Sequence, residues 1–128
     1  MIALKRAYEE PDEADGLRVL VDRLWPRGVR KDDAHLDAWL KELAPSDELR
    51  RWFAHDPERW AEFRRRYRDE LRSEAARNAI DDLAKRSRRE TVTLVHAARD
   101  ESHNNAVVLL ELIDRAAHSR AKKRRDAQ

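Results

Sequence analysis

Residues 91–98, Thr-Val-Thr-Leu-Val-His-Ala-Ala, decide the fold of this chain. The stretch carries no charged residue on either of its alternating faces and is rich in β-branched side chains. Strands that are uncharged on both faces are typical of the centre of a parallel sheet, where helices cover both sides. The stretch therefore predicts a central strand in an α/β domain.

Two further strands are predicted near the start of the chain. Ile2, Leu4 and Tyr8 alternate with polar residues, and residues 17–22 are apolar and β-branched. The connection over residues 9–16 is too short for a crossover helix. We therefore expect the first two strands to form a hairpin.

The sixty residues between the second and third strands have the spacing of helices, as does the stretch after residue 101. The expected helices run from Asp33 to Leu43, from a start at Ser46, from Asp56-Pro57 along the stripe Trp60, Phe63, Tyr67 and Leu71, from Glu74 to Lys85, and from a cap at Ser102 through Ile113. A helical crossover makes the second and third strands parallel. The fold class is α/β: a small single-domain sandwich whose few-stranded, mostly parallel sheet is covered by helices, with a helical insertion between strands two and three.

The length of 128 residues fits one domain. The chain has no cysteine, which excludes a disulfide framework, a thiolate nucleophile and a cysteine-based zinc site. No apolar run approaches the length of a membrane span, and the first six residues lack the apolar stretch of a secretory signal. We expect a cytoplasmic protein with no membrane partner.

The net charge of +2 is unevenly distributed. Residues 118–128 contain five basic residues and one acidic residue, so the rest of the chain is slightly acidic. With no apolar residue larger than alanine, this segment is predicted to be a disordered tail after a single domain over residues 1–117. It either attracts nucleic acid through phosphate contacts or serves as a solubilising terminus.

Ligands of parallel α/β sheets bind beyond the carboxyl ends of the strands. Two loops should meet at that edge here, residues 22–31 after the second strand and residues 99–105 after the third. The sequence therefore predicts the binding site between these loops.

The first of these loops begins Asp22-Arg23-Leu24-Trp25-Pro26-Arg27. Asp22 can act as a general base or orient a ligand, while Arg23, Trp25 and Arg27 bind an anionic substrate, the guanidinium groups in fork geometry. Alternatively, Asp22 accepts backbone N–H groups in a tight turn and Trp25 covers the core. The residues alone leave both interpretations open.

The second loop contains Ser102-His103-Asn104-Asn105 at the expected start of the last helix. Free N–H groups and the helix dipole favour an anion there, held with the help of Asn104 and Asn105. His103 is the second candidate for proton transfer, as a neutral base or donor facing inward. The alternative is local capping by the asparagine side chains beside a histidine with a structural role.

The four tryptophans fall within 36 residues, and Phe53, Phe63 and Tyr67 lie among them or soon after. Packing of the helical layer is the first explanation, and a stacking wall for a planar ligand is the alternative. Arg66 lies on the helix face beside Phe63 and Tyr67 and is a candidate anion-binding residue.

The histidines show no H-x-x-x-H spacing, and the two glycines form no phosphate-binding loop. We therefore expect no metal and no cofactor. Clustering of His55 with Asp22 and His103 stays open at this point.

Several motifs give the chain a family resemblance. Val-Asp-Arg-Leu-Trp-Pro-Arg-Gly over residues 21–28, Lys-Glu-Leu-Ala-Pro-Ser over 41–46 and His-Asn-Asn-Ala over 103–106 resemble the domain of unknown function 488 (DUF488) family, in its short YeaO-like branch. The resemblance covers roughly residues 2 to 115 and implies a compact bacterial α/β domain, but no assigned activity. Longer members carry a Cys-His-Arg-type motif where this chain has Ser102-His103-Asn104, so thiol chemistry is not implied here.

Three classes of function follow from these observations. The first is an enzyme acting on a small anionic substrate, with Asp22 and His103 transferring protons. The second is a nucleic-acid or nucleotide binding module that uses the basic tail and the Trp-rich layer. The third is a structural or partner-binding domain without catalysis, and the sequence leaves the oligomeric state open.

Overall fold

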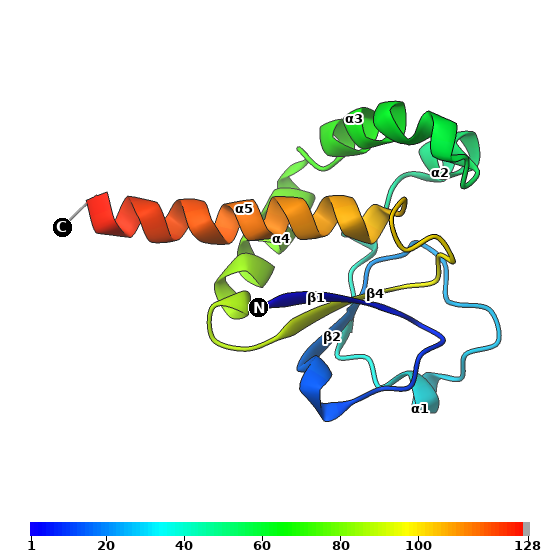
Figure 1. Cartoon of the computed structure of the whole chain (residues 1–128), viewed down its shortest axis with the longest axis horizontal. Helices are drawn as coiled ribbons and strands as arrows, with labels where there is room; N and C mark the ends of the chain where they lie inside the picture. Colours follow the sequence, from blue (N-terminus) through cyan, green and yellow to red (C-terminus); the bar gives the residue numbers. More distant parts are fainter. Residues whose placement is uncertain (127–128) are drawn as a thin grey trace.

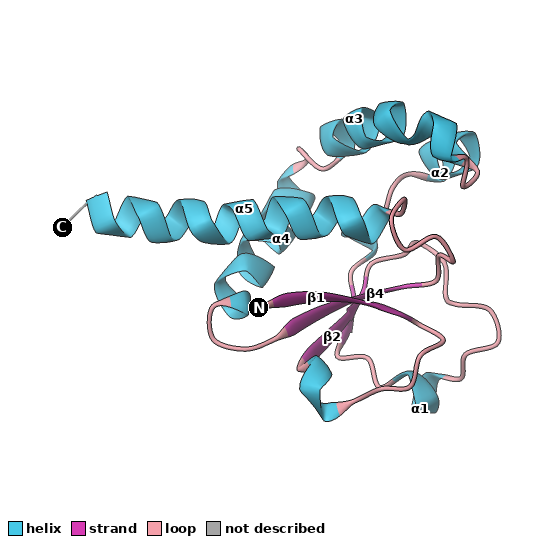
Figure 2. Ribbon diagram, in the orientation of Figure 1, coloured by secondary structure: helices cyan, strands magenta, loops and turns pink. Residues whose placement is uncertain are grey.

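The computed structural model describes residues 1–126 as one α/β domain with a four-stranded sheet (Figures 1 and 2). All strands are parallel, in the order β1-β4-β2-β3. In chain order the elements are β1 (Ile2–Arg6), the 3₁₀ turn η1 (Glu13–Asp15), β2 (Leu17–Leu20), α1 (Lys31–Ala34), β3 (Ala38–Trp39), η2 (Lys41–Leu43), α2 (Asp47–Phe53), η3 (Pro57–Arg59), α3 (Trp60–Glu70), α4 (Glu74–Ser87), β4 (Val92–His96) and α5 (Asn105–Asp126).

The predicted central strand is confirmed as β4, which is buried along its whole length. It pairs with β1 on one side and β2 on the other, with Val92 opposite both Ile2 and Leu17. Helices α4 and α5 cover one face of the sheet, and η1 and α1 lie on the other (Figure 1). The α/β class, the mostly parallel sheet and the helical insertion before β4 are therefore confirmed.

The predicted hairpin of the first two strands is wrong, because β4 lies between them and both run parallel to it. The ten residues 7–16 lead from the end of β1 back to the start of β2. An extended chain of ten residues reaches about 33 Å, which is ample for strands of four or five residues. A crossover therefore forms here with a 3₁₀ turn and no long helix.

The predicted helix from Asp33 to Leu43 is also wrong in most of its length. After the single turn of α1, His35 takes a left-handed conformation with φ of 48° and ends the helix. The chain then pairs with β2: the Asp37 amide donates to the Arg18 carbonyl at 2.8 Å and the Leu40 amide donates to the Leu20 carbonyl at 3.0 Å. Pairing with the sheet outweighs the helical spacing of the apolar side chains.

The other helix signals are confirmed with small shifts. Ser46 caps α2 through its hydroxyl, which accepts from the Leu49 amide at 3.1 Å. Asp56 caps the η3 turn that leads into α3, and α4 spans the predicted stretch from Glu74. The last helix begins at Asn105 instead of directly after Ser102.

Helix α5 continues through Asp126, where a disordered tail was predicted. Residues 118–126 therefore differ from that expectation. Alanine, lysine and arginine are good helix formers, so the segment can extend the helix that packs on the sheet. The predicted disorder of residues 127 and 128 lies outside the described residues.

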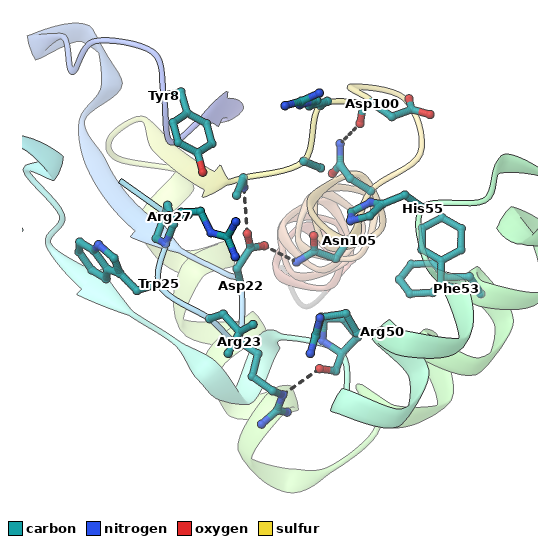
Figure 3. A pocket seen from close by; sticks show the side chains of 18 residues that line it. Tyr8, Asp22, Arg23, Trp25, Arg27, Arg50, Phe53, His55, Asp100 and Asn105 are labelled. Carbon is teal, nitrogen blue, oxygen red and sulfur yellow. Dashed lines mark hydrogen bonds between the residues drawn. The ribbon is translucent and has the colours of Figure 1, made fainter. Parts of the chain in front are cut away.

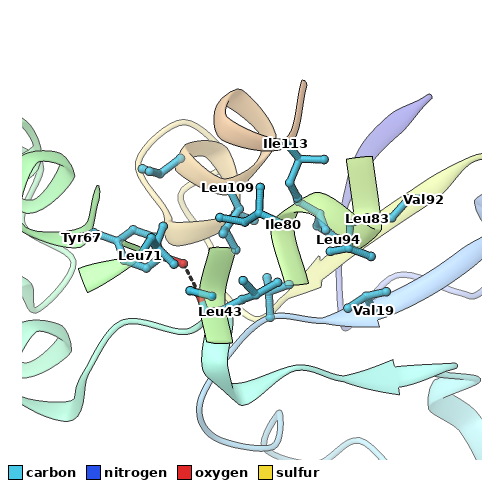
Figure 4. Packing of buried hydrophobic residues seen from close by; sticks show 14 of the residues in the cluster. Val19, Leu43, Tyr67, Leu71, Ile80, Leu83, Val92, Leu94, Leu109 and Ile113 are labelled. Atoms are coloured by element: carbon cyan, nitrogen blue, oxygen red, sulfur yellow. Dashed lines mark hydrogen bonds between the residues drawn. The ribbon is translucent and has the colours of Figure 1, made fainter. Parts of the chain in front are cut away.

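The core lies between the sheet and the helices α3, α4 and α5 (Figure 4). Val19 and Leu94 of the sheet contact the same apolar cluster as Leu83 of α4 and Leu109 of α5. Arg64 and Arg68 of α3 both bind Glu111 of α5, at 2.8 and 2.9 Å. These contacts fix the start of α5 above the ends of β2 and β4, which positions the site described next.

Candidate functional site

A cavity of about 570 Å³ opens at the carboxyl edge of the sheet (Figure 3). The loops after β2 and β4 form two of its walls, and the start of α5 and the end of α2 form the others. Volumes between roughly 300 and 1,000 Å³ are usual for small-molecule sites. The two loops that the sequence selected do meet at one edge, as predicted.

The carboxylate of Asp22 makes hydrogen bonds to two other segments at this edge of the sheet. Its Oδ2 accepts from the Ala97 amide at 2.8 Å, and its Oδ1 accepts from Asn105 Nδ2 at 3.2 Å. The same amide group of Asn105 donates to the Val21 carbonyl at 3.0 Å. Asp22 therefore joins the end of β2 to the end of β4 and to the first residue of α5.

Burial raises the pKa of Asp22 above its usual range, although the hydrogen bonds from Ala97 and Asn105 and the charge of His55 act in the opposite direction. No ion pair links Asp22 to any side chain within the described part of the chain. A half-buried carboxylate without a cationic partner is thus exposed to the cavity.

Arg23 and Arg27, the arginines of the first loop that were predicted to bind an anion, differ in whether they already have partners in the protein. Arg23 donates from Nε to the Pro45 carbonyl at 3.0 Å and lies 3.9 Å from Asp47. Arg27 is exposed, lines the cavity and makes no hydrogen bond or ion pair with another described residue. Arg99 of the second loop is likewise exposed, lines the cavity and makes no hydrogen bond or ion pair with another described residue. Arg27 and Arg99 are therefore the arginines available to a ligand.

The cavity floor is aromatic. The rings of Phe53 and Phe63 stack with centroids 4.2 Å apart, and both residues line the cavity. Trp25 also lines it and donates to the Val29 carbonyl at 2.6 Å, and Tyr8 lies across the cavity from Phe53 (Figure 3). Of the four tryptophans, Trp25 alone lines this cavity in the described structure, and the stacking wall for a planar ligand stays a prediction.

His103 does not line the cavity. Its Nδ1 lies 2.9 Å from Asp100 Oδ2, and its ring meets Trp60 edge-on at 5.3 Å. The hydrogen bonds that Asp100 accepts from the Ser102 amide and from His103 lower the pKa of Asp100. The expectation that His103 faces the site from the last helix is wrong because Asp100 organises a turn before that helix begins.

Asn104 and Asn105 fit the capping interpretation and also line the cavity. Asn104 Oδ1 accepts from the Val107 amide at 3.1 Å, which makes Asn104, and not Ser102, the cap of α5. Its Nδ2 donates to the Asp100 carbonyl at 2.9 Å. The two asparagines thereby hold the loop after β4 against the helix.

Arg66 lies outside the cavity. Its Nε donates to Glu62 at 3.0 Å, and its guanidinium lies over the Trp52 ring at 4.4 Å. Phe63, which shares a helix face with Arg66, does line the cavity, whereas the Arg66 guanidinium is held by Glu62 and Trp52. The structure therefore does not bring Arg66 to the site.

His55 joins the site, which the sequence left open. Ala54 and His55 both have positive φ, 47° and 57°, so two successive residues adopt the left-handed conformation. This conformation is costly for residues with a β-carbon and is found where the surroundings enforce it. Figure 3 shows the His55 ring directed into the cavity above Asn105.

Sequence reasoning missed that α2 forms a wall of the cavity, with Arg50 in its lining, and left the place of His55 open. No local pattern marks these residues, because the approach of α2 to the sheet edge is a long-range contact. The described residues contain no cluster of three or more groups able to hold a metal ion. None of the described helices is long and apolar enough to cross a membrane.

Together the fold and the site define a small α/β domain with a ligand-sized cavity beyond its parallel strands. The chain belongs to the DUF488 family, and it matches the family model described as "Inactive DUF488-N3 subclade" over residues 1–128. The predicted family resemblance is therefore confirmed.

Two relatives show how far this similarity extends. "Uncharacterized protein Rv3073c" of Mycobacterium tuberculosis (strain ATCC 25618 / H37Rv) is 46% identical over 113 residues, which is 88% of this chain and 93% of the relative. "Uncharacterized protein YeaO" of Escherichia coli (strain K12) is 41% identical over 111 residues, which is 86% of this chain and 94% of the relative. No solved structure matches the chain significantly.

Proposed function

We propose that this chain is a binding domain for small organic anions and that the cavity beyond β2 and β4 is its site. The observation that carries the proposal is the pair Arg27 and Arg99, which line the cavity without a partner among the described residues. Guanidinium groups bind carboxylate and phosphate in fork geometry. The apolar floor formed by Phe53 and Phe63 favours a ligand with an apolar body.

Binding without catalysis is the better supported form of this proposal. A proton-transferring pair of Asp22 and His103 would need both groups at the ligand, and His103 does not line the cavity but pairs with Asp100, which does. The description of the matching family as an inactive subclade agrees with this interpretation. We therefore propose ligand binding ahead of the enzyme, which was one of three classes of function that the sequence left open.

Thermal unfolding in the presence of 3-phenylpropionate tests the proposal. A ligand at about 100 times its Kd stabilises a protein by about 2.7 kcal/mol, which should raise the Tm by several degrees. Arg27→Ala and Arg99→Ala should each weaken binding by about three- to tenfold, because each removes a charge-assisted contact at a partly hydrated rim.

The matched control is Arg89→Ala, because Arg89 is an exposed arginine at the opposite end of β4. It should bind the probe as the wild type does. Unchanged Tm values for the wild type across 3-phenylpropionate, inorganic phosphate and acetate would reject the proposal and leave a structural or partner-binding domain.

Nucleic-acid binding is a second candidate, which the projection of α5 beyond the sheet favours (Figure 1). If residues 119–128 contact phosphates, their removal should abolish retardation of duplex DNA at about 50 mM salt, and wild-type affinity should fall steeply with salt concentration. A truncated chain that retards DNA as the full chain does would contradict this candidate.

A further inference from the structure

The carboxylate of Asp22 has unused capacity for hydrogen bonds. An ionised carboxylate offers about four acceptor positions. The described structure fills one position on each oxygen, by the Ala97 amide and by Asn105 Nδ2. Asp22 lines the cavity, so its remaining positions are accessible to a ligand there (Figure 3).

Asp22 also has an unbalanced charge. The described arginines, lysines and histidines lie beyond ion-pair distance of its oxygens, although four arginines line the same cavity. His55, which lies on the far side of the cavity, lowers the pKa of Asp22 electrostatically and without contact. A cation on the cavity side therefore stabilises the Asp22 carboxylate, and a simple anion placed beside it would be repelled.

The cavity thus presents two charges of opposite sign. Arg27 enters it from the loop after β2, while Asp22 lies at its base between β2 and α5 (Figure 3). Figure 3 shows both side chains directed into the same space. A ligand that carries only an anionic group satisfies Arg27 and leaves Asp22 without a donor.

We infer that the site takes a dipolar small molecule, with an anionic group at Arg27 and Arg99, a protonated amine at Asp22, and an apolar body against Phe53 and Phe63. This inference rests on the proposed function and names its ligand class. Amino acids with apolar side chains have this chemistry.

Isothermal titration calorimetry with matched probes tests the inference. The probes are L-phenylalanine, 3-amino-3-phenylpropanoate and 3-phenylpropionate, which share a phenyl ring and a carboxylate and differ in the presence and position of the amine. One of the two amino compounds should bind the wild-type protein about tenfold more tightly than 3-phenylpropionate. Two positions of the amine are used because they place the ammonium group at different distances from the carboxylate of the probe.

Asp22→Asn should abolish this preference, so that the amino compounds and 3-phenylpropionate bind within about twofold of one another. Arg89→Ala is the companion variant, because Arg89 is exposed outside the cavity and its loss leaves the Asp22 carboxylate in place. It should keep the preference for the amine. Arg27→Ala should weaken the binding of all three probes alike, since all three carry the carboxylate.

The outcomes separate the inference from the proposed function. If 3-phenylpropionate binds and neither amino compound binds more tightly, the inference is overturned and the anion-binding function stands. A purely structural role of Asp22 would lower stability in Asp22→Asn and leave the ratio of affinities unchanged, which also overturns it. If no probe binds the wild type, both the inference and the proposed function fail.

Discussion

Replacing Gly16 with alanine is expected to lower the free energy of unfolding by about 3–5 kcal/mol. Gly16 precedes β2 and has φ of 62° and ψ of −131°, a region that is almost exclusive to glycine. A β-carbon there would overlap the Thr91 carbonyl oxygen and lie 3.0 Å from its carbonyl carbon. The same oxygen accepts from the Leu17 amide at 2.9 Å, so the start of β2 would have to move away from β4.

Gly28→Ala is the control for this prediction. Gly28 also has a positive φ, 81°, but nothing lies within 4 Å of the β-carbon that alanine would add. Its cost should stay near 1–2 kcal/mol, because only the conformational strain remains. Urea unfolding measures both changes. Equal effects of the two substitutions would show that the close approach of Gly16 to Thr91 does not hold β2 in place.

Lowering the pH from about 7 to about 4 is expected to remove about 3 kcal/mol of stability through His96. Burial and the neighbouring charge of Arg6 lower the pKa of His96 to about 4. The unfolded chain binds this proton near pH 6.5, so between these values the unfolded state holds more protons than the folded state. The contribution is complete above pH 6.5 and is lost as the pH falls toward 4.

His96→Gln tests the assignment, because glutamine is polar and does not titrate in this range. The variant should show a flatter dependence of the free energy of unfolding on pH between 6.5 and 4 than the wild type. Urea unfolding at several pH values gives both curves. Parallel curves for the two proteins would mean that another group causes the loss. The buried Nδ1 of His96 has no partner in the described structure, which is consistent with a neutral ring.

The order of the strands depends on contacts that sequence patterns do not encode. The apolar stretch of β4 was sufficient to predict its central position, because a strand that is buried on both faces has uncharged side chains at every position. The pairing of β1 with β4 instead of β2 depends on how residues 7–16 cross the sheet. The short strand β3 likewise depends on main-chain hydrogen bonds to β2. Its side chains have the spacing of a helix, so the sequence pattern does not indicate this pairing.

The position of the candidate site could be predicted only as far as the order of the strands and loops determines it. Asp22, Arg27 and Asn105 follow from the rule that loops meet at the carboxyl edge of a parallel sheet. His103 was misplaced because its interaction with Asp100 shifts the start of α5 by a few residues, which changes the direction of the side chain. His55 reaches the cavity through two left-handed residues after α2, a conformation that no sequence pattern indicates.

The Asp22 contacts link the stability of this edge to the proposed binding site. Through Ala97 and Asn105 this carboxylate joins three elements that are distant in sequence. A ligand that binds Asp22 would therefore also strengthen the junction of β2, β4 and α5. Ligand binding and the stability of this edge are thus expected to be coupled.

A crystal structure of the protein soaked with 3-phenylpropionate would show directly whether the cavity binds an organic anion. We expect the carboxylate of the probe at Arg27 and Arg99, with its phenyl ring against Phe53 and Phe63. A well-ordered crystal in which this cavity holds only water at saturating probe, or in which the probe binds elsewhere on the surface, would contradict it.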